Sequence, residues 1–327
     1  MSMWVHPPIS PDALRNAEDE SLRKELQWYL KSLQTSLIAL KEGLEECVKL
    51  LAPVEPGSTL VLSSLRSESV KGFVTRIGTK ITKGDIQLRL LTVPPNTAKT
   101  AANSTSSTRL SFKPSPQSPE IVLPQLLSVR SLINDALDII DISRWTGSSC
   151  DASFIWGQLK LLHDRLSEAK TCLKGTTPGA APLDVPGTDW TKDSVPDEVF
   201  DPSLPGALSL HFSIQDANLV LTIRSIVPAS PGGTPNTPSE SAFSLSGLHL
   251  RNRLLGISTR LPNHDESGEV FEWRGKQDVI VREKARVETG DPSLISVAAK
   301  LSALEHEVAR WRFNLNILMG KGDDDDD

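Results

Sequence analysis

The sequence predicts an α+β protein, on two observations. Four segments repeat apolar residues at the alternating three- and four-residue spacing of an amphipathic helix, and two of these segments lie near the two ends of the chain. Further segments alternate apolar and polar residues with a period of two, which is typical of strands. Each helix has one apolar stripe that must be covered, so a four-helix bundle is the simplest arrangement of the helices.

The two longest helical runs each carry eight apolar positions and an identifiable stop. The first run ends before Pro53 and the second opens at Asp291-Pro292, an N-cap followed by a first-turn proline, and closes at Gly320. Two such runs, each with its own stop signal, are unlikely to arise by chance. The first comprises Leu26, Leu30, Leu33, Leu37, Leu40, Leu44, Cys47 and Leu51, and the second Leu294, Val297, Leu301, Leu304, Val308, Trp311, Leu315 and Leu318.

Two shorter helical runs lie between them. One follows Pro124 and the other is ended by Gly175. Their apolar positions are Leu126, Val129, Ile133, Ala136 and Ile140 in the first, and Ile155, Leu159, Leu162, Leu166, Ala169 and Leu173 in the second. From all four runs we take as the bundle core Leu26, Leu30, Leu33, Leu37, Leu40, Leu44, Leu51, Leu126, Ile133, Ile140, Leu159, Leu162, Leu166, Leu294, Val297, Leu301, Leu304, Val308, Trp311, Leu315 and Leu318.

The segments with a period of two fall in two blocks of the sequence. The clearest is a hairpin in which 208–214 and 219–223 flank Asp216-Ala217-Asn218. Strands are also predicted over 59–63, 70–77 and 85–91, and over 270–273 and 279–287 directly before the last helix. If the two blocks form one sheet, the chain leaves and re-enters both domains.

Three stretches rich in proline separate these elements and show neither period. Because they cannot bury enough apolar surface to offset the entropy of ordering, we expect loops or disordered insertions there. Ser-Pro and Thr-Pro pairs in them are either phosphorylation sites or ordinary loop composition. The predicted organisation is a helical domain (12–53, 120–175 and 291–320), a β domain (57–92 and 206–290), insertions (93–119, 176–205 and 228–241) and an acidic tail (321–327).

The charge of the chain argues against nucleic acid as a partner. The formal net charge is −6, and the five aspartates at 323–327 supply most of it, so the rest of the chain is nearly neutral. Binding to phosphates needs a surplus of Lys and Arg. The tail is either a solvated disordered end, a docking tail for a basic partner, or an artificial extension. Three cysteines without CxxC spacing indicate a reducing compartment.

No pattern in the sequence indicates catalysis, a cofactor or a metal. GxGxxG, GxxxxGK[ST], HExxH and GxSxG are all absent, and the six histidines are scattered. Adjacent His163 and Asp164 point about 100° apart on a helix, so we expect a solvated face rather than an acid/base pair. Cys47 occupies a predicted core position and is expected to be a small hydrophobe. We therefore expect no catalytic, cofactor or metal residues. No segment approaches the roughly 18 consecutive apolar residues of a membrane span.

The order of these parts resembles the Rogdi family of leucine-zipper-containing proteins, which includes the second subunit of the fungal RAVE complex. The resemblance lies in the N-terminal helix with residues 26–30 (LQWYL), the strand block with 70–72 (VKG), two middle helices, the 208–223 hairpin, and 270–273 (VFEW) before the last helix. It covers nearly the whole chain apart from the insertions and the tail.

The resemblance implies an elongated molecule of two domains, in which the N- and C-terminal helices pair in opposite directions within the bundle. It also implies a non-enzymatic adaptor that promotes assembly of the vacuolar-type proton ATPase. The expected partners are a large β-propeller scaffold subunit and, directly or through it, the peripheral sector of the ATPase, without membrane insertion. The expected location is the cytoplasm, with peripheral association at vacuolar or endosomal membranes left open. The alternative is a self-associating coiled-coil scaffold without a role in the ATPase.

Overall fold

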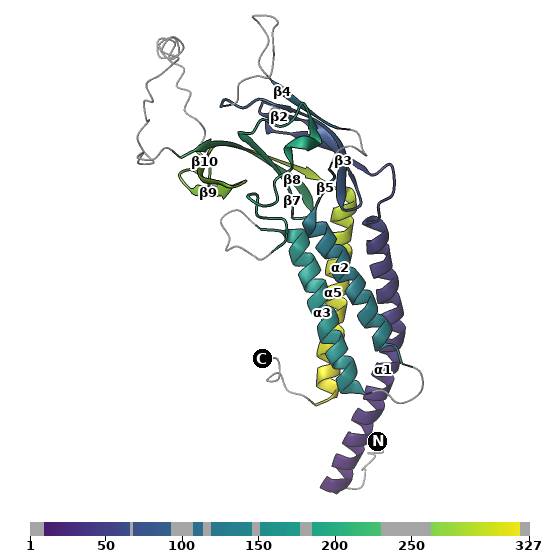
Figure 1. Cartoon of the computed structure of the whole chain (residues 1–327). Coiled ribbons are helices and arrows are strands. Elements are labelled where there is room, and N and C mark those ends of the chain that lie inside the picture. Colours follow the sequence, from purple (N-terminus) through teal and green to yellow (C-terminus); the bar gives the residue numbers. More distant parts are fainter. Residues whose placement is uncertain are drawn as a thin grey trace, which may run out of the picture. The chain divides into compact units, whose positions relative to one another are not determined.

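The computed structural model describes residues 10–65, 68–92, 107–113, 119–145, 151–176, 185–229 and 263–320. It contains four long helices and two antiparallel sheets, which confirms the predicted α+β class (Figure 1). The chain divides into two compact units. The helical unit holds residues 1–51, 128–171 and 296–327, and the β unit holds 52–127 and 172–295. Helices α2, α3 and α5 therefore contribute residues to both units.

Helix α1 (Pro11–Leu50) is the longest element, and local signals define both of its ends. The Ser10 hydroxyl accepts a hydrogen bond from the Ala13 amide at 3.2 Å, and Pro11 occupies the first turn. Buried positions begin at Leu30 and continue to Cys47, while residues 10–25 are exposed on every side. In Figure 1 these N-terminal turns extend past the ends of the other helices of the unit.

The other helices are α2 (Pro124–Ser143), α3 (Ala152–Lys174) and α5 (Pro292–Leu318). The contacts between α1 and α5 run in opposite order along the two helices. Near the start of the buried part of α1, the Tyr29 hydroxyl donates to the carbonyl of Trp311 in α5 at 3.2 Å. Near the end of α1, Glu46 pairs with Lys300, which lies closer to the start of α5. Helix α1 also contacts α2, through an ion pair between Lys41 and Asp141 at 2.6 Å.

The first sheet has six strands in the order β1-β2-β3-β4-β6, with β5 also paired to β3, and every pairing is antiparallel. Residues that point to one face of β1 to β4, such as Leu62, Val74, Ile86 and Leu110, are fully buried, as a half-exposed sheet requires. The strands are β1 (Ser58–Ser63), β2 (Val70–Ile77), β3 (Lys80–Leu88), β4 (Thr108–Phe112), β5 (Ile121–Val122) and β6 (Phe200–Asp201).

The second sheet has the antiparallel order β7-β8-β10-β9. Its strands are β7 (Leu208–Gln215), β8 (Asn218–Pro228), β9 (Val270–Trp273) and β10 (Lys276–Gly290). The predicted hairpin joins β7 to β8 through a two-residue turn, in which Asp216 and Ala217 both have positive φ, at 47° and 59°. A positive φ at both central residues is the backbone of a type I′ turn, which matches the twist of the flanking strands.

Part of the sequence expected to be insertion is ordered secondary structure. Residues 108–112 form β4, and 197–201 form a short 3-10 helix (η2, Asp197–Val199) followed by β6. These short elements carry too few residues to show a period, and tertiary contacts order them. Leu110 and Phe200 are fully buried, and the Phe112 and Phe200 rings pack edge to face at 5.1 Å.

The segment at 185–205 covers the second sheet, although we expected an insertion there. Its Trp190 packs in one buried cluster with Ile226, Trp273, Val279 and Val281. An aromatic anchor in a stretch rich in Pro and Asp was the signal that could have indicated order. The predicted insertions at 93–106, 114–118 and 230–241 and the tail at 321–327 lie outside the described residues.

Candidate functional site

Most of the predicted bundle positions are buried in the helical unit. Leu126 and Leu294 lie in the β unit, because α2 and α5 begin there. The remaining positions lie in the helical unit, where Leu26, Leu304 and Leu318 are partly exposed. The buried ones there are Leu30, Leu33, Leu37, Leu40, Leu44, Leu51, Ile133, Ile140, Leu159, Leu162, Leu166, Val297, Leu301, Val308, Trp311 and Leu315.

The residues that the sequence analysis weighed for chemistry lie in separate surroundings. No cluster of three or more His, Cys, Asp and Glu in the described ranges could hold a metal ion. The Cys47 thiol is fully buried, and burial raises its pKa to about 11. A thiol with so high a pKa is a poor nucleophile at neutral pH. His163 and Asp164 stand 3.7 Å apart on α3, and the Asp164 side chain is about half exposed.

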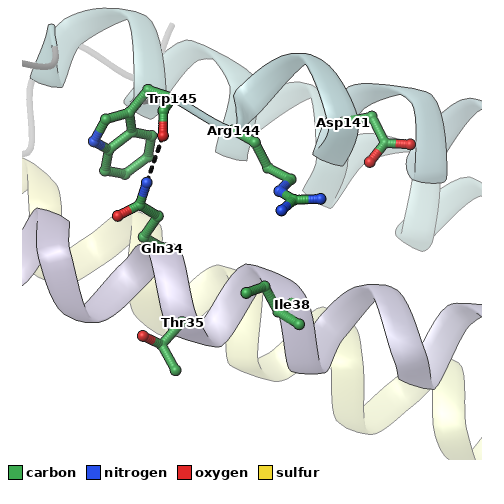
Figure 2. Close-up of a pocket in the computed structure, with 6 residues that line it drawn as sticks. All are labelled: Gln34, Thr35, Ile38, Asp141, Arg144 and Trp145. Atoms are coloured by element: carbon green, nitrogen blue, oxygen red, sulfur yellow. Dashed lines mark hydrogen bonds between the residues drawn. The ribbon is translucent and has the colours of Figure 1, made fainter. Parts of the chain in front are cut away.

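A groove of about 440 Å³ opens between α1 and the C-terminal end of α2 in the helical unit (Figure 2). About one turn of each helix supplies its lining, with Gln34, Thr35 and Ile38 from α1 and Asp141, Arg144 and Trp145 from the last turn of α2 and the residues after it. The Gln34 side-chain amide donates to the Trp145 carbonyl at 2.5 Å, which fixes the backbone just past the end of α2.

The groove has the chemistry of a contact surface. Ile38 is 46% exposed, so an apolar side chain lies open to a partner. Asp141 is held by Lys41, whose ammonium contacts both carboxylate oxygens at 2.6 and 2.7 Å. The exposed Arg144 makes no ion pair with any described residue and is free to meet a carboxylate. The groove can therefore hold a side chain of a partner.

The β unit contains a buried ion pair that the sequence did not indicate. The Arg76 guanidinium donates to Asp291 Oδ2 at 2.5 Å, and the two side chains are only 2% and 0% exposed. The other Asp291 oxygen caps α5 by accepting from the Ser293 amide at 3.0 Å. The partners are 215 residues apart, so only the fold shows that the predicted cap also neutralises a buried arginine of β2.

A second polar cluster lies on the sheet of β7, β8 and β10. Arg224 forms two hydrogen bonds with the Glu266 carboxylate at 2.7 Å, and its guanidinium stacks 4.6 Å from the Trp190 ring. Next to it, His211 Nε2 lies 3.0 Å from the Gly187 carbonyl. Burial, and then the charge of Arg224, lower the His211 pKa to about 4. This histidine is neutral at physiological pH and acts as part of the core.

Comparison with known proteins identifies relatives over most of the chain. The sequence model of the "Rogdi leucine zipper containing protein" family matches residues 25–316. A zebrafish (Danio rerio) protein described as "Protein rogdi homolog" is 25% identical over 240 residues, which cover 68% of this chain and 74% of that protein. In the described part of the chain, no helix combines the length and apolarity needed to cross a membrane.

Proposed function

Because the chain belongs to the Rogdi leucine zipper containing protein family, we propose that it is a non-catalytic adaptor of a RAVE-like complex that promotes assembly of the vacuolar-type proton ATPase. The family match over residues 25–316 carries this proposal, since it spans both units. In this proposal the partners are a large β-propeller scaffold subunit and the peripheral sector of the ATPase. The protein acts in the cytoplasm or at the surface of acidic organelles.

The architecture that we propose for this role is one four-helix bundle and one β domain. Contacts of α1 with α5 and with α2, and of α3 with α5 through Lys170 and Glu305, support the bundle. An adaptor needs rigid surfaces rather than reactive groups. The open groove beside Ile38 and Arg144 is one such surface.

The experiment that tests the proposal is affinity purification of the tagged protein from its own cells, followed by mass spectrometry. We expect a large propeller-repeat protein together with subunits of the proton ATPase. A matched preparation of Leu301→Asp, which places a carboxylate at a fully buried position, should lose them. Recovery of neither class with the wild-type protein would overturn the adaptor proposal.

One observation favours the second candidate, a self-associating coiled-coil scaffold. Residues 10–25 of α1 are exposed on all sides, and Leu14 and Leu22 within them are each about half exposed. An isolated helix of this length is marginal in water, so a second chain could stabilise it. Sedimentation equilibrium separates the candidates. A monomer mass independent of concentration contradicts the scaffold, and a dimer that Leu14→Glu with Leu22→Glu dissociates supports it.

A further inference from the structure

The solvent-facing side of the six-stranded sheet concentrates positive charge on a protein that is negative overall. The register places Lys71 beside Gln87 and Gln87 beside Arg109 in one row across β2, β3 and β4. Lys83 lies four residues before Gln87 on the same side of β3, and its side chain is exposed. Arg89 is exposed between the buried Leu88 and Leu90, and Lys113 follows Ser111 by two residues, so both fall on this side. We call these residues and the side chains between them the basic face.

The positive charge of the basic face is largely uncompensated. Five cations stand against two carboxylates, Asp85 and Asp201, whereas the whole chain carries −6. Arg109 is paired with Asp85 at 3.0 Å. Within the described ranges the other four cations, Lys71, Lys83, Arg89 and Lys113, form no ion pair. A local surplus of positive charge attracts a partner whose surface is negative.

Apolar side chains lie between the rows of cations. Val61 and Phe73 are cross-strand partners on β1 and β2, and they are 67% and 44% exposed. Their row runs between the row of Lys71 and Arg109 and the row of Lys83, each about 6.8 Å away, which is the length of two residues along a strand. The same row continues over Asp85, Ser111 and Asp201 of β3, β4 and β6, so it is apolar only at its β1–β2 end, where Lys71 and Lys83 lie in the rows on either side.

We propose that the basic face binds an acidic amphipathic helix of a protein partner. A helix about 10 Å wide that crosses the β1–β2 end of this row would place its apolar stripe on Val61 and Phe73, and Asp or Glu at its two flanks would reach the cations on either side. Covering the open face of a sheet with a helix is the usual way such a face is buried.

The charges favour a protein over an anionic membrane as the occupant. Each lysine or arginine near an anionic membrane contributes about 1 kcal/mol. However, Asp85 and Asp201 lie on the same face and would be repelled by lipid phosphates, whereas a peptide can place its own carboxylates only opposite the cations. The inference deepens the proposed adaptor function by assigning a partner surface to the β unit.

The direct test uses the full-length protein and a labelled synthetic peptide of about 18 residues, or about 27 Å of helix. The peptide carries leucine on one face and glutamate on both flanks, and a matched peptide carries lysine in place of glutamate. By fluorescence anisotropy we expect saturable binding of the acidic peptide, weakened by added salt. Lys71→Glu with Lys83→Glu should weaken it at least tenfold, and Phe73→Ala several-fold, at unchanged melting temperature.

Two controls decide the interpretation. Lys24→Glu with Lys31→Glu makes the same change of charge on exposed α1 positions and should leave the affinity unchanged. Absence of binding, equal binding of the lysine peptide, or equal affinity of the Lys71/Lys83 variant would each overturn the proposal. Vesicles of phosphatidylserine and phosphatidylcholine (3:7) test the membrane instead. Vesicle binding that the Lys71/Lys83 variant loses, without peptide binding, would also overturn it.

Purification from cells separates failure of this inference from failure of the adaptor proposal. If the wild type recovers the scaffold and the Lys71/Lys83 variant does not, the basic face is supported. If both recover it, the basic face is not the docking surface, and the adaptor function stands. If neither recovers it, the adaptor function is overturned, and the peptide titration still decides the basic face.

Discussion

The helical unit and the β unit place their charges differently. In the helical unit, ion pairs such as Lys41–Asp141 join helices at their surfaces, with side chains 28% and 49% exposed. In the β unit, Arg76 and Asp291 are paired in the interior at 2% and 0% exposure. Exposed pairs contribute about 0–1 kcal/mol, whereas removing one partner of a buried pair costs about 3–5 kcal/mol. The helical unit thus depends on its apolar stripes, and the β unit depends in addition on specific polar pairs.

The strongest test of this difference is a charge in the helical core. Leu301 is fully buried, so Leu301→Asp removes its packing, worth about 2–5 kcal/mol, and also buries an unpaired carboxylate. We expect loss of the cooperative unfolding of the helical unit, measured as a lower melting temperature and lower helical signal in circular dichroism. Leu22→Asp, on a residue that is 48% exposed, is the matched control and should change little. Equal melting of the two variants would contradict the role of the stripe.

The next largest effect is expected at the buried ion pair. Asp291→Ala leaves Arg76 buried without a counter-charge and removes the cap of α5, so it should cost about 3–5 kcal/mol in urea-induced unfolding. Asp141→Ala, which breaks the exposed pair with Lys41, should cost less than about 1 kcal/mol. Similar losses in both variants would show that burial does not distinguish the two pairs.

Acid should weaken the β unit through His211. Its pKa is about 4 in the folded protein and 6.5 as an ordinary histidine, so between these values the unfolded chain binds more protons. Above pH 6.5 the side chain is neutral in both the folded and the unfolded protein, so it does not change the free energy of unfolding. As the pH falls from 6.5 to 4, the free energy of unfolding decreases by about 3 kcal/mol, because one pKa unit corresponds to about 1.36 kcal/mol.

The measurement is urea unfolding at several pH values for the wild type and His211→Gln. The variant should be less sensitive to pH between 4 and 6.5, while His306→Gln on an exposed position of α5 should behave as the wild type. Identical pH profiles for all three proteins would mean that His211 is not the responsible group.

The smallest expected effect compares two glycines within helices of the helical unit. A Cβ at Gly157 of α3 would meet no described atom within 4 Å, so Gly157→Ala should stabilise by about 0.5–1 kcal/mol through helix propensity. A Cβ at Gly43 of α1 would lie 3.0 Å from Leu304 Cδ2, so Gly43→Ala should gain less or lose stability. Thermal melts of the two variants provide the comparison, and equal gains would show that the α1–α5 contact is loose at Gly43.

The helices were the most predictable part of the fold, because their signals are local. The start of α5 follows from Asp291 and Pro292, and the stripe from Leu30 to Cys47 follows from helical spacing alone. β4 and β6 could not be predicted, since a strand of two to five residues has no period and depends on partners such as Phe112 and Phe200 that are distant in sequence. The basic face was equally hidden, because its cations come from separate strands.

The sequence by itself determined the fold class, the positions of the four helices and the faces of those helices that are apolar, since burial along a helix repeats every 3.6 residues. Only the tertiary structure decided which distant residues meet. It divided the strands between two sheets, placed Arg76 against Asp291, and aligned Lys71 and Arg109 in one row. The physical reason is that strand register and buried polar pairs join segments from different parts of the chain, and no local pattern in the sequence records those distances.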